Sequence, residues 1–247
     1  MGRNEACRRW RRTSPQRHRG RRGEGEEQRN FSAFSASLRF IIPRESLLTR
    51  LILIRHGETD WNVEGRYQGQ ADPPLNDRGK AQARRLAEEL EGIGLEVLYA
   101  SPLRRALHTA QTIAERLDLP LHIEPRLMEI HLGRWQGLLW TEIAARYPDL
   151  FRRWQTEPWE VTPPGGESLA QVQARVYAAV DDILARHPGR CVGLVTHRLP
   201  IALLKIRYQG LDRDAVRTLE LPNTYWEEIV TDHASRFTHH EPLIREA

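Results

Sequence analysis

The chain has 247 residues, a formal net charge of +4 and two cysteines. That length is enough for one domain of about 200 residues that buries roughly 70% of its unfolded surface. No run of 18 apolar residues is present, so the sequence predicts no membrane-spanning helix. Two cysteines provide neither a disulfide framework nor a metal cluster and are typical of a reducing compartment, so we expect a cytoplasmic protein.

The positive charge belongs to the start of the chain. The first 50 residues hold 13 arginines and five glutamates, whereas the remainder holds 24 basic and 28 acidic residues, a net charge of −4. We therefore do not expect the folded part to bind nucleic acid. Residues 1–47 have few large apolar side chains and are predicted to be a disordered, Arg-rich extension, followed by one domain over residues 48–247. The alternatives for the extension are a nucleic-acid-binding arm, a targeting peptide and a start assigned too far upstream.

The first element of the folded part is also the one with the clearest chemistry. Leu51–Ile54 is an apolar run that predicts a short buried strand. Arg55 and His56 follow it directly, and Gly57 then allows the backbone to turn and approach a ligand closely. In open α/β sheets, ligands bind beyond the carboxyl ends of the strands. A guanidinium can bind phosphoryl oxygens and an imidazole can attack phosphorus, so this strand end predicts a site for phosphoryl chemistry.

The next elements alternate between helix and strand. After a turn-rich loop over residues 66–75, Asn76 is predicted to cap a helix with an apolar face and an exposed charged face. Val97–Ser101 predicts a second strand, and the helix that follows opens with Arg104 and Arg105. A basic group again lies at the carboxyl end of a strand, although spacing alone does not distinguish the two arginines.

A third strand is predicted at residues 121–124, and it is followed by a region rich in tryptophan. Four of the seven tryptophans lie between residues 135 and 160, and they are Trp135, Trp140, Trp154 and Trp159. The apolar residues of this region have helical spacing, so most of these rings are predicted to pack as a small cap over the site.

The last part of the chain repeats the pattern of the first strand. Ser168 is predicted to cap an amphipathic helix. Cys191–Thr196 then predicts a buried strand that delivers His197 at its end, as the first strand delivers His56. A further apolar helix is predicted over residues 199–206, and a final strand at Asn223–Val230.

Several of these segments together resemble a known family. The run Leu53–Asn62 resembles the signature of the histidine phosphatase superfamily, which contains the cofactor-dependent phosphoglycerate mutases and their phosphatase relatives. Three further segments resemble the family's other motifs and follow in the family's order, namely Ser101–Ala106, Leu127–Gly137 and Cys191–His197. The resemblance implies an α/β fold, a three-layer α/β/α sandwich with a mostly parallel central sheet, which agrees with the alternation of strands and helices.

The resemblance also implies a role for each matching residue. His56 corresponds to the nucleophile that forms a phosphohistidine, and Glu129 to the group that protonates the leaving oxygen and later deprotonates water. The predicted phosphate-binding residues are Arg55, Asn62, Arg105 and His197, and the predicted substrate-binding residues are Thr59, Gln68 and Gly69. Since arginines take the place of a divalent ion, we expect no metal and no cofactor.

Two positions depart from the pattern of the family. The phosphatase branch usually has an acidic residue where this chain has His131, and the family usually has glycine where this chain has Arg198. Arg198 is expected to narrow or re-aim the pocket.

The sequence favours the phosphatase branch, because the insert before His197 is short and family mutases have a longer one. The expected reaction is hydrolysis of a small phosphorylated metabolite, of the sugar phosphate, phosphoglycerate or ribazole phosphate type. The Trp-rich cap and the absence of a second basic cluster favour a monophosphate with an apolar portion. A 2,3-bisphosphoglycerate-dependent mutase is the first alternative, and an inactive binding protein with a basic, nucleic-acid-binding tail is the second. The sequence is silent on oligomeric state, and a homodimer stays open.

Overall fold

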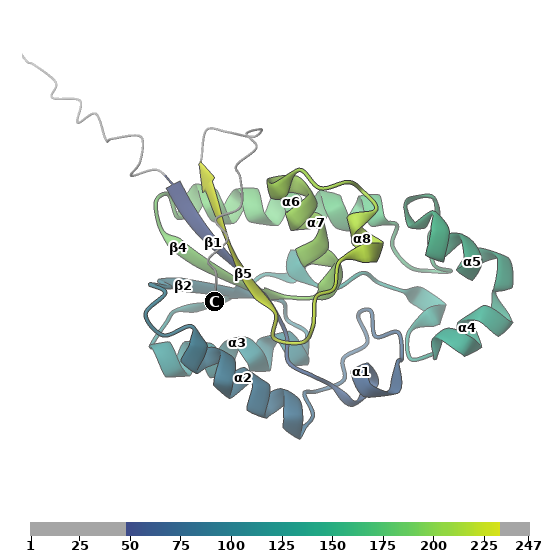
Figure 1. Ribbon diagram of the computed structural model, residues 1–247, viewed down its shortest axis with the longest axis horizontal. Coiled ribbons are helices and arrows are strands. Elements are labelled where there is room, and N and C mark those ends of the chain that lie inside the picture. Colours follow the sequence, from purple (N-terminus) through teal and green to yellow (C-terminus); the bar gives the residue numbers. More distant parts are fainter. Residues whose placement is uncertain (1–47, 233–247) are drawn as a thin grey trace, which may run out of the picture. The chain divides into compact units, whose positions relative to one another are not determined.

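A central five-stranded sheet organises residues 48–232, the part of the chain that the computed structural model describes. The predicted extension over residues 1–47 lies outside it. The strand order is β3-β2-β4-β1-β5 (Figure 1). The strands are β1 (Leu48–Arg55), β2 (Val97–Ala100), β3 (Leu121–Ile123), β4 (Cys191–Thr196) and β5 (Trp226–Asp232). The first four are parallel and β5 runs antiparallel to β1, so the prediction of a mostly parallel sheet is confirmed.

Helices cover both faces of this sheet, which gives the predicted three layers (Figure 1). One face packs against α2 (Asp77–Glu89) and α3 (Arg104–Leu117). The other packs against α6 (Leu169–Arg186) and α7 (Arg198–Gln209). The shorter helices are α1 (Asp60–Glu64), α4 (Trp140–Arg146), α5 (Pro148–Thr156) and α8 (Ala215–Thr218), with single 3-10 turns at Pro125–Leu127, Gly133–Trp135 and Pro158–Glu160.

The strand β1 shows how an apolar run supports two cores at once. Successive side chains of a strand point to opposite faces of the sheet. Leu51 and Leu53 accordingly belong to the core beneath α6 and α7, whereas Ile52 and Ile54 belong to the core beneath α2 and α3. All four are fully buried. The central strand therefore holds its carboxyl end, with Arg55 and the residues that follow, in a fixed position.

Most of the predicted helix starts are confirmed. Asn76 accepts a hydrogen bond from the backbone N–H of Gly79 at the start of α2, and Ser168 caps α6 in the same way. The final strand starts three residues later than predicted. Asn223 and Thr224 form a turn in which Thr224 has a φ of 59°, and this turn is bonded to the carbonyl of His56.

The predicted tryptophan cap is confirmed for three of its four rings. Trp135 is fully buried, and Trp154 packs edge-on against it with ring centroids 5.8 Å apart. Trp159 is partly buried against the same core. The prediction covered most of the rings, and the exception is Trp140, which is 56% exposed at the first residue of α4. Among the described residues, no helix combines the length and apolar character that crossing a membrane requires.

Candidate active site

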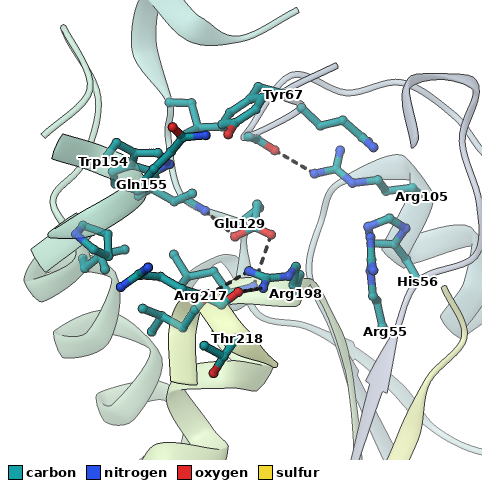
Figure 2. Close-up of a pocket in the computed structure, with 18 residues that line it drawn as sticks. Arg55, His56, Tyr67, Arg105, Glu129, Trp154, Gln155, Arg198, Arg217 and Thr218 are labelled. Atoms are coloured by element: carbon teal, nitrogen blue, oxygen red, sulfur yellow. Dashed lines mark hydrogen bonds between the residues drawn. The ribbon is translucent and has the colours of Figure 1, made fainter. Parts of the chain in front are cut away.

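A cavity of about 590 Å³ lies beyond the carboxyl ends of β1 and β4, where the sequence places its candidate residues. Arg55, His56 and Arg105 line one end of it, and Glu129 lies between them and the far wall (Figure 2). The far wall is formed by the end of α5, the start of α7 and three of the four residues of the short helix α8. The pocket thus joins the strand ends of the sheet to the tryptophan-rich cap.

His56 is held as a neutral imidazole with a defined tautomer. Its side chain is 3% exposed, and burial, reinforced by the positive charges of Arg105 and Arg55, lowers its pKa well below the usual value. Its Nδ1 lies 2.7 Å from the carbonyl oxygen of Gly57. Since a carbonyl oxygen only accepts hydrogen bonds, Nδ1 carries the proton and Nε2 carries the lone pair.

The glycine that supplies this carbonyl is required by close packing. A Cβ on Gly57 would lie 2.6 Å from the carbonyl oxygen of Gly79, and a Cβ on Gly79 would lie 2.1 Å from the carbonyl oxygen of Glu58. The turn after His56 therefore sits directly on the first turn of α2. Its backbone N–H at Gly57 is also bonded to the hydroxyl of Thr109, at 3.1 Å.

His197 lies next to His56, with ring centroids 5.1 Å apart, and is fully buried. Burial, followed by the charge of Arg105, lowers its pKa well below the usual value as well. Its Nε2 lies 2.8 Å from the hydroxyl of Ser101, which already accepts a hydrogen bond from the backbone N–H of Leu103. A hydroxyl can donate one hydrogen bond and accept two, so this contact fits either tautomer of His197. The Nδ1 of His197 has no hydrogen-bond partner among the described residues.

The two predicted arginines face the same end of the pocket. Arg105 is 1% exposed, and its guanidinium donates to the carbonyls of Gly69 and Ala71. Arg55 donates to the carbonyl of Leu221. The Nε atoms of both arginines are buried without a partner in the described part of the chain. Burial lowers the pKa of each guanidinium to about 10, so both remain cationic at neutral pH.

These unpartnered nitrogens identify what the pocket end can bind. Buried N–H groups are nearly always hydrogen-bonded, because an unpaired one costs about 1–3 kcal/mol. Here the Nε–H groups of Arg55 and Arg105 are unpaired, and so is Nδ1 of His197, whose ring centroid lies 5.1 Å from that of His56. The two buried positive charges act on His56 as well. A tetrahedral dianion such as a phosphoryl group offers several acceptor oxygens and the matching charge.

Glu129 is positioned through its backbone by a residue that the sequence reasoning missed. Its carboxylate accepts hydrogen bonds from the backbone N–H of Ile130 at 2.9 Å and of Leu199 at 3.4 Å. The guanidinium of Arg175, from α6, donates to the carbonyls of Met128 and Glu129 and also pairs with Glu167 through two oxygens. Arg175 thus anchors the segment that carries Glu129, and only the packing of α6 beside this segment shows it.

The remaining predicted residues fall into two groups. Gln68 and Gly69 line the pocket. Thr59 and Asn62 form a capping box at the start of α1, in which each accepts a hydrogen bond from the other's backbone N–H. Asn62 also accepts from the side chain of Asn223, which reaches the carbonyl of His56 as well. Neither Thr59 nor Asn62 lies among the residues that line the cavity, so their substrate contacts stay predictions.

The far wall of the pocket contains Arg198, as expected, and also the charge of Arg217, which the sequence reasoning did not expect there. Arg198 and Arg217 both line it, so the prediction that the chain lacks a second basic cluster is wrong. Arg198 lies at the start of α7 and donates to three backbone carbonyls in and after α8. Within residues 48–232, no group of three or more His, Cys, Asp or Glu side chains is arranged to hold a metal ion.

Comparison with known proteins agrees with this geometry. Residues 51–240 match the family model of the histidine phosphatase superfamily (branch 1), and the chain belongs to this superfamily. It is similar to phosphoserine phosphatase 1 of Hydrogenobacter thermophilus, with 44% identity over 67% of this chain and 78% of the relative. It is also similar to glucosyl-3-phosphoglycerate phosphatase of Mycobacterium tuberculosis, with 39% identity over 64% of this chain and 76% of the relative.

The solved structures include a close match to the fold. A mycobacterial glucosyl-3-phosphoglycerate phosphatase in complex with VO3 superimposes with a TM-score of 0.67, at 37% identity, and the match covers 72% of this chain and 91% of that structure. Family, fold and relatives together make the protein a phosphomonoesterase for small phosphorylated metabolites.

Proposed function

We propose that the protein hydrolyses phosphomonoesters in two steps, through a phosphoryl group carried on Nε2 of His56. The observation that carries this proposal is the tautomer of His56. With its proton fixed on Nδ1 by the carbonyl of Gly57, the neutral ring presents the Nε2 lone pair to a bound phosphoryl group. A histidine that is buried beside two guanidinium groups stays unprotonated and is therefore ready to attack.

In the first step, Nε2 of His56 forms a bond to phosphorus while the bond from phosphorus to the ester oxygen breaks. Arg55 and Arg105 hold the phosphoryl oxygens, His197 donates from Nδ1, and Asn62 adds a hydrogen bond. The two buried positive charges and the unpartnered nitrogens support these roles. Fixed donors of this kind stabilise the charge that develops on the oxygens in the transition state.

Glu129 handles the protons of both steps. It protonates the leaving oxygen in the first step, and in the second it takes a proton from the water that attacks phosphorus. The bond from phosphorus to Nε2 then breaks, its electron pair returns to His56, and inorganic phosphate leaves. Two backbone N–H groups and the anchoring by Arg175 hold Glu129 between the phosphate end and the far wall, which supports this assignment.

The far end of the pocket is open to solvent, which favours hydrolysis over the mutase reaction, in which the phosphoryl group is returned to a bound acid. Gln155, Arg217 and Thr218 line the pocket and are exposed to solvent. A mutase must keep water away from the phosphohistidine, and these positions leave a route for water. The name of one relative, a phosphoserine phosphatase, supports a substrate in which the phosphate is esterified to an alkyl hydroxyl of a small molecule.

The test is a single-turnover reaction in the presence of EDTA, run once with p-nitrophenyl phosphate and once with 3-phosphoglycerate. Each reaction is quenched in alkali so that phosphohistidine survives. We expect a phosphorylated peptide that contains His56 and the release of free phosphate. His56→Ala should remove both, whereas the matched control His108→Ala, an exposed histidine of α3, should keep both. Turnover that survives His56→Ala would refute the mechanism, and isomerised 3-phosphoglycerate without free phosphate would favour the mutase alternative.

The role of Glu129 has its own test, because leaving groups differ in their need for an acid. Glu129→Gln should slow hydrolysis of phosphoserine by about 10² to 10⁴-fold, since its alkoxide must be protonated. p-Nitrophenyl phosphate has a far better leaving group, so the rate at which it phosphorylates the enzyme should fall much less in Glu129→Gln. Equal losses for both substrates in the phosphorylation step would show that Glu129 is not the acid.

A further inference from the structure

The far wall of the pocket is built around a residue that replaces the glycine typical of the family. Arg198 follows His197 directly and is the first residue of α7. Its guanidinium donates to the carbonyls of Val216 at 2.9 Å, Arg217 at 3.2 Å and Leu219 at 3.0 Å. These bonds hold α8 against the pocket, so that the side chains of α8 become part of its wall (Figure 2).

Arg198 lines the same cavity of about 590 Å³ as Arg55 and Arg105, so one small molecule can contact both ends. Its charge lowers the pKa of Arg55 and also acts on the hydroxyl of Tyr67 across the pocket. An arginine has five N–H groups, and the three carbonyl bonds use three of them. The same guanidinium can therefore hold α8 and still donate to a bound ligand.

Arg217 adds a second positive charge at the rim. It lines the pocket from α8, and its guanidinium donates to the carbonyl of Thr156 at 3.1 Å, which joins α8 to the end of α5. Asp214 lies 3.8 Å from the same guanidinium and offsets part of its charge. The hydroxyl of Thr218 and the amide of Gln155 line the wall beside it.

The charges of the two ends of the pocket set the charge of the ligand. Arg55 and Arg105 balance a phosphoryl dianion. At the far end Arg198 and Arg217 carry two positive charges and Asp214 one negative charge. Glu129 lies between the two ends and, in the proposed first step, carries the proton that it delivers to the leaving oxygen, so it adds no charge to the substrate complex. One positive charge at the far end is left to be balanced. A carboxylate supplies a single negative charge and two oxygens in the plane that a guanidinium matches, whereas a second phosphate would bring an excess of negative charge.

We propose that Arg198 and Arg217 bind a carboxylate of the substrate, so that the protein selects phosphorylated acids over phosphorylated alcohols of the same size. This inference rests on the proposed function, because it assigns the second half of the same pocket. It names a class of substrate, a phosphate ester that carries a carboxylate within one small molecule.

The experiment compares 3-phosphoglycerate with glycerol 3-phosphate, which differ only in a carboxylate against a hydroxymethyl group. For the unmodified protein we expect kcat/KM to favour 3-phosphoglycerate by about 10- to 100-fold, as a charge-assisted pair of hydrogen bonds allows. Arg217→Met should reduce this ratio by up to about 10-fold, since its side chain is part-exposed and screened. Arg198→Met should reduce it further.

Arg152→Met is the matched control, because Arg152 is an exposed arginine of α5 that pairs with Asp149 and does not line the pocket. The ratio should be unchanged in this variant. Because Arg198→Met also removes the bonds to α8, Arg198→Lys is made beside it, and a melting curve is recorded for each variant. Inhibition of p-nitrophenyl phosphate hydrolysis by the two compounds gives a second measure of preference in the unmodified protein.

The outcomes separate the inference from the proposed function. Equal kcat/KM values for the two compounds, or a preference that survives both Arg217→Met and Arg198→Met, would overturn the carboxylate site while leaving the phosphatase intact. Hydrolysis of p-nitrophenyl phosphate without any hydrolysis of 3-phosphoglycerate would overturn it as well. Failure to hydrolyse even p-nitrophenyl phosphate would instead refute the proposed function.

Discussion

The ends of β1 and β4 are neighbouring parallel strand ends, and each is followed directly by a buried histidine, with the two rings 5.1 Å apart. Both imidazoles have a lowered pKa. They differ in the partners of their ring nitrogens. Nδ1 of His56 donates to the carbonyl of Gly57, which leaves the lone pair of Nε2 for attack. Nε2 of His197 lies against the hydroxyl of Ser101, and in the proposed mechanism it accepts from that hydroxyl, so that Nδ1 donates to the phosphoryl group. One hydrogen-bond partner thus separates a nucleophile from a donor.

The largest expected effect comes from removing the rings themselves. His56→Asn removes the nucleophile and should lower kcat by about 10⁴-fold or more, with no phosphoenzyme. His197→Asn keeps the nucleophile and removes one donor, so kcat should fall by about 10² to 10³-fold while phosphoenzyme still forms. Rapid-quench kinetics on both variants measures the amount of phosphoenzyme, and steady-state assays measure kcat. Loss of phosphoenzyme in both variants alike would erase the distinction between the two histidines.

The residues that follow the two histidines give the next contrast. Gly57→Ala places a Cβ 2.6 Å from a backbone oxygen of α2, so the turn must shift, at a cost of about 1–3 kcal/mol in unfolding free energy. Arg198→Ala creates no clash at the start of a helix and loses three hydrogen bonds at the protein surface, so its cost should be smaller. Urea unfolding of the two variants tests the order, and a more costly Arg198→Ala would contradict it.

The tautomer of His197 can be changed without touching the ring. In the proposed mechanism the hydroxyl of Ser101, which lies 2.8 Å from Nε2 of His197, donates to this nitrogen. Ser101→Ala removes the hydroxyl, so the ring is free to place its proton on Nε2 and lose its donor to the phosphoryl group. We expect kcat/KM to fall by about 10-fold, in line with the loss of one hydrogen bond to a charged group. The chemical shifts of the ring nitrogens report the tautomer directly, and unchanged shifts with unchanged kinetics would contradict the assignment.

Stability should also depend on pH through these rings, and here the two should behave alike. The unfolded chain binds a proton at each histidine below about pH 6.5, whereas the folded protein does not, because both folded pKa values are lowered. The free energy of unfolding is therefore highest above that pH, and it decreases as the pH falls below it, by about 1.4 kcal/mol per pH unit for each ring. His56→Asn should reduce the slope of unfolding free energy between pH 6 and 5 by this amount, and an unchanged slope would show that His56 is protonated in the folded state.

The sequence predicts the parts of this site that follow directly from a strand or helix end. His56 and His197 come at the ends of apolar runs, so their convergence follows from parallel pairing. The family resemblance assigns the phosphate-binding role to Arg105 rather than to its neighbour, and in the structure Arg105 is buried and lines the pocket while Arg104 is exposed. Such residues are fixed by local pattern and by the order of the motifs.

Contacts between distant segments could not be predicted in this way. Arg175 is one polar residue on an amphipathic helix, and its bonds to the segment of Glu129 depend on how α6 packs. Arg217 lies in a helix of four residues with no periodic pattern, and it reaches the pocket only because Arg198 holds α8 there. Thr59 and Asn62 carry a local signal that was missed, since a threonine followed three residues later by an amide is the pattern of a helix cap.

The crowding of Arg55 and Arg105 has a consequence for how the protein responds to its own product. Burial lowers the pKa of both guanidinium groups to about 10, so each site without an anion carries charge that the surroundings solvate poorly. Inorganic phosphate carries the same dianionic group as the substrate, and its negative charge neutralises the two poorly solvated guanidinium charges in the same way. The free product should therefore compete with substrate and raise the melting temperature, so that turnover slows wherever phosphate is plentiful.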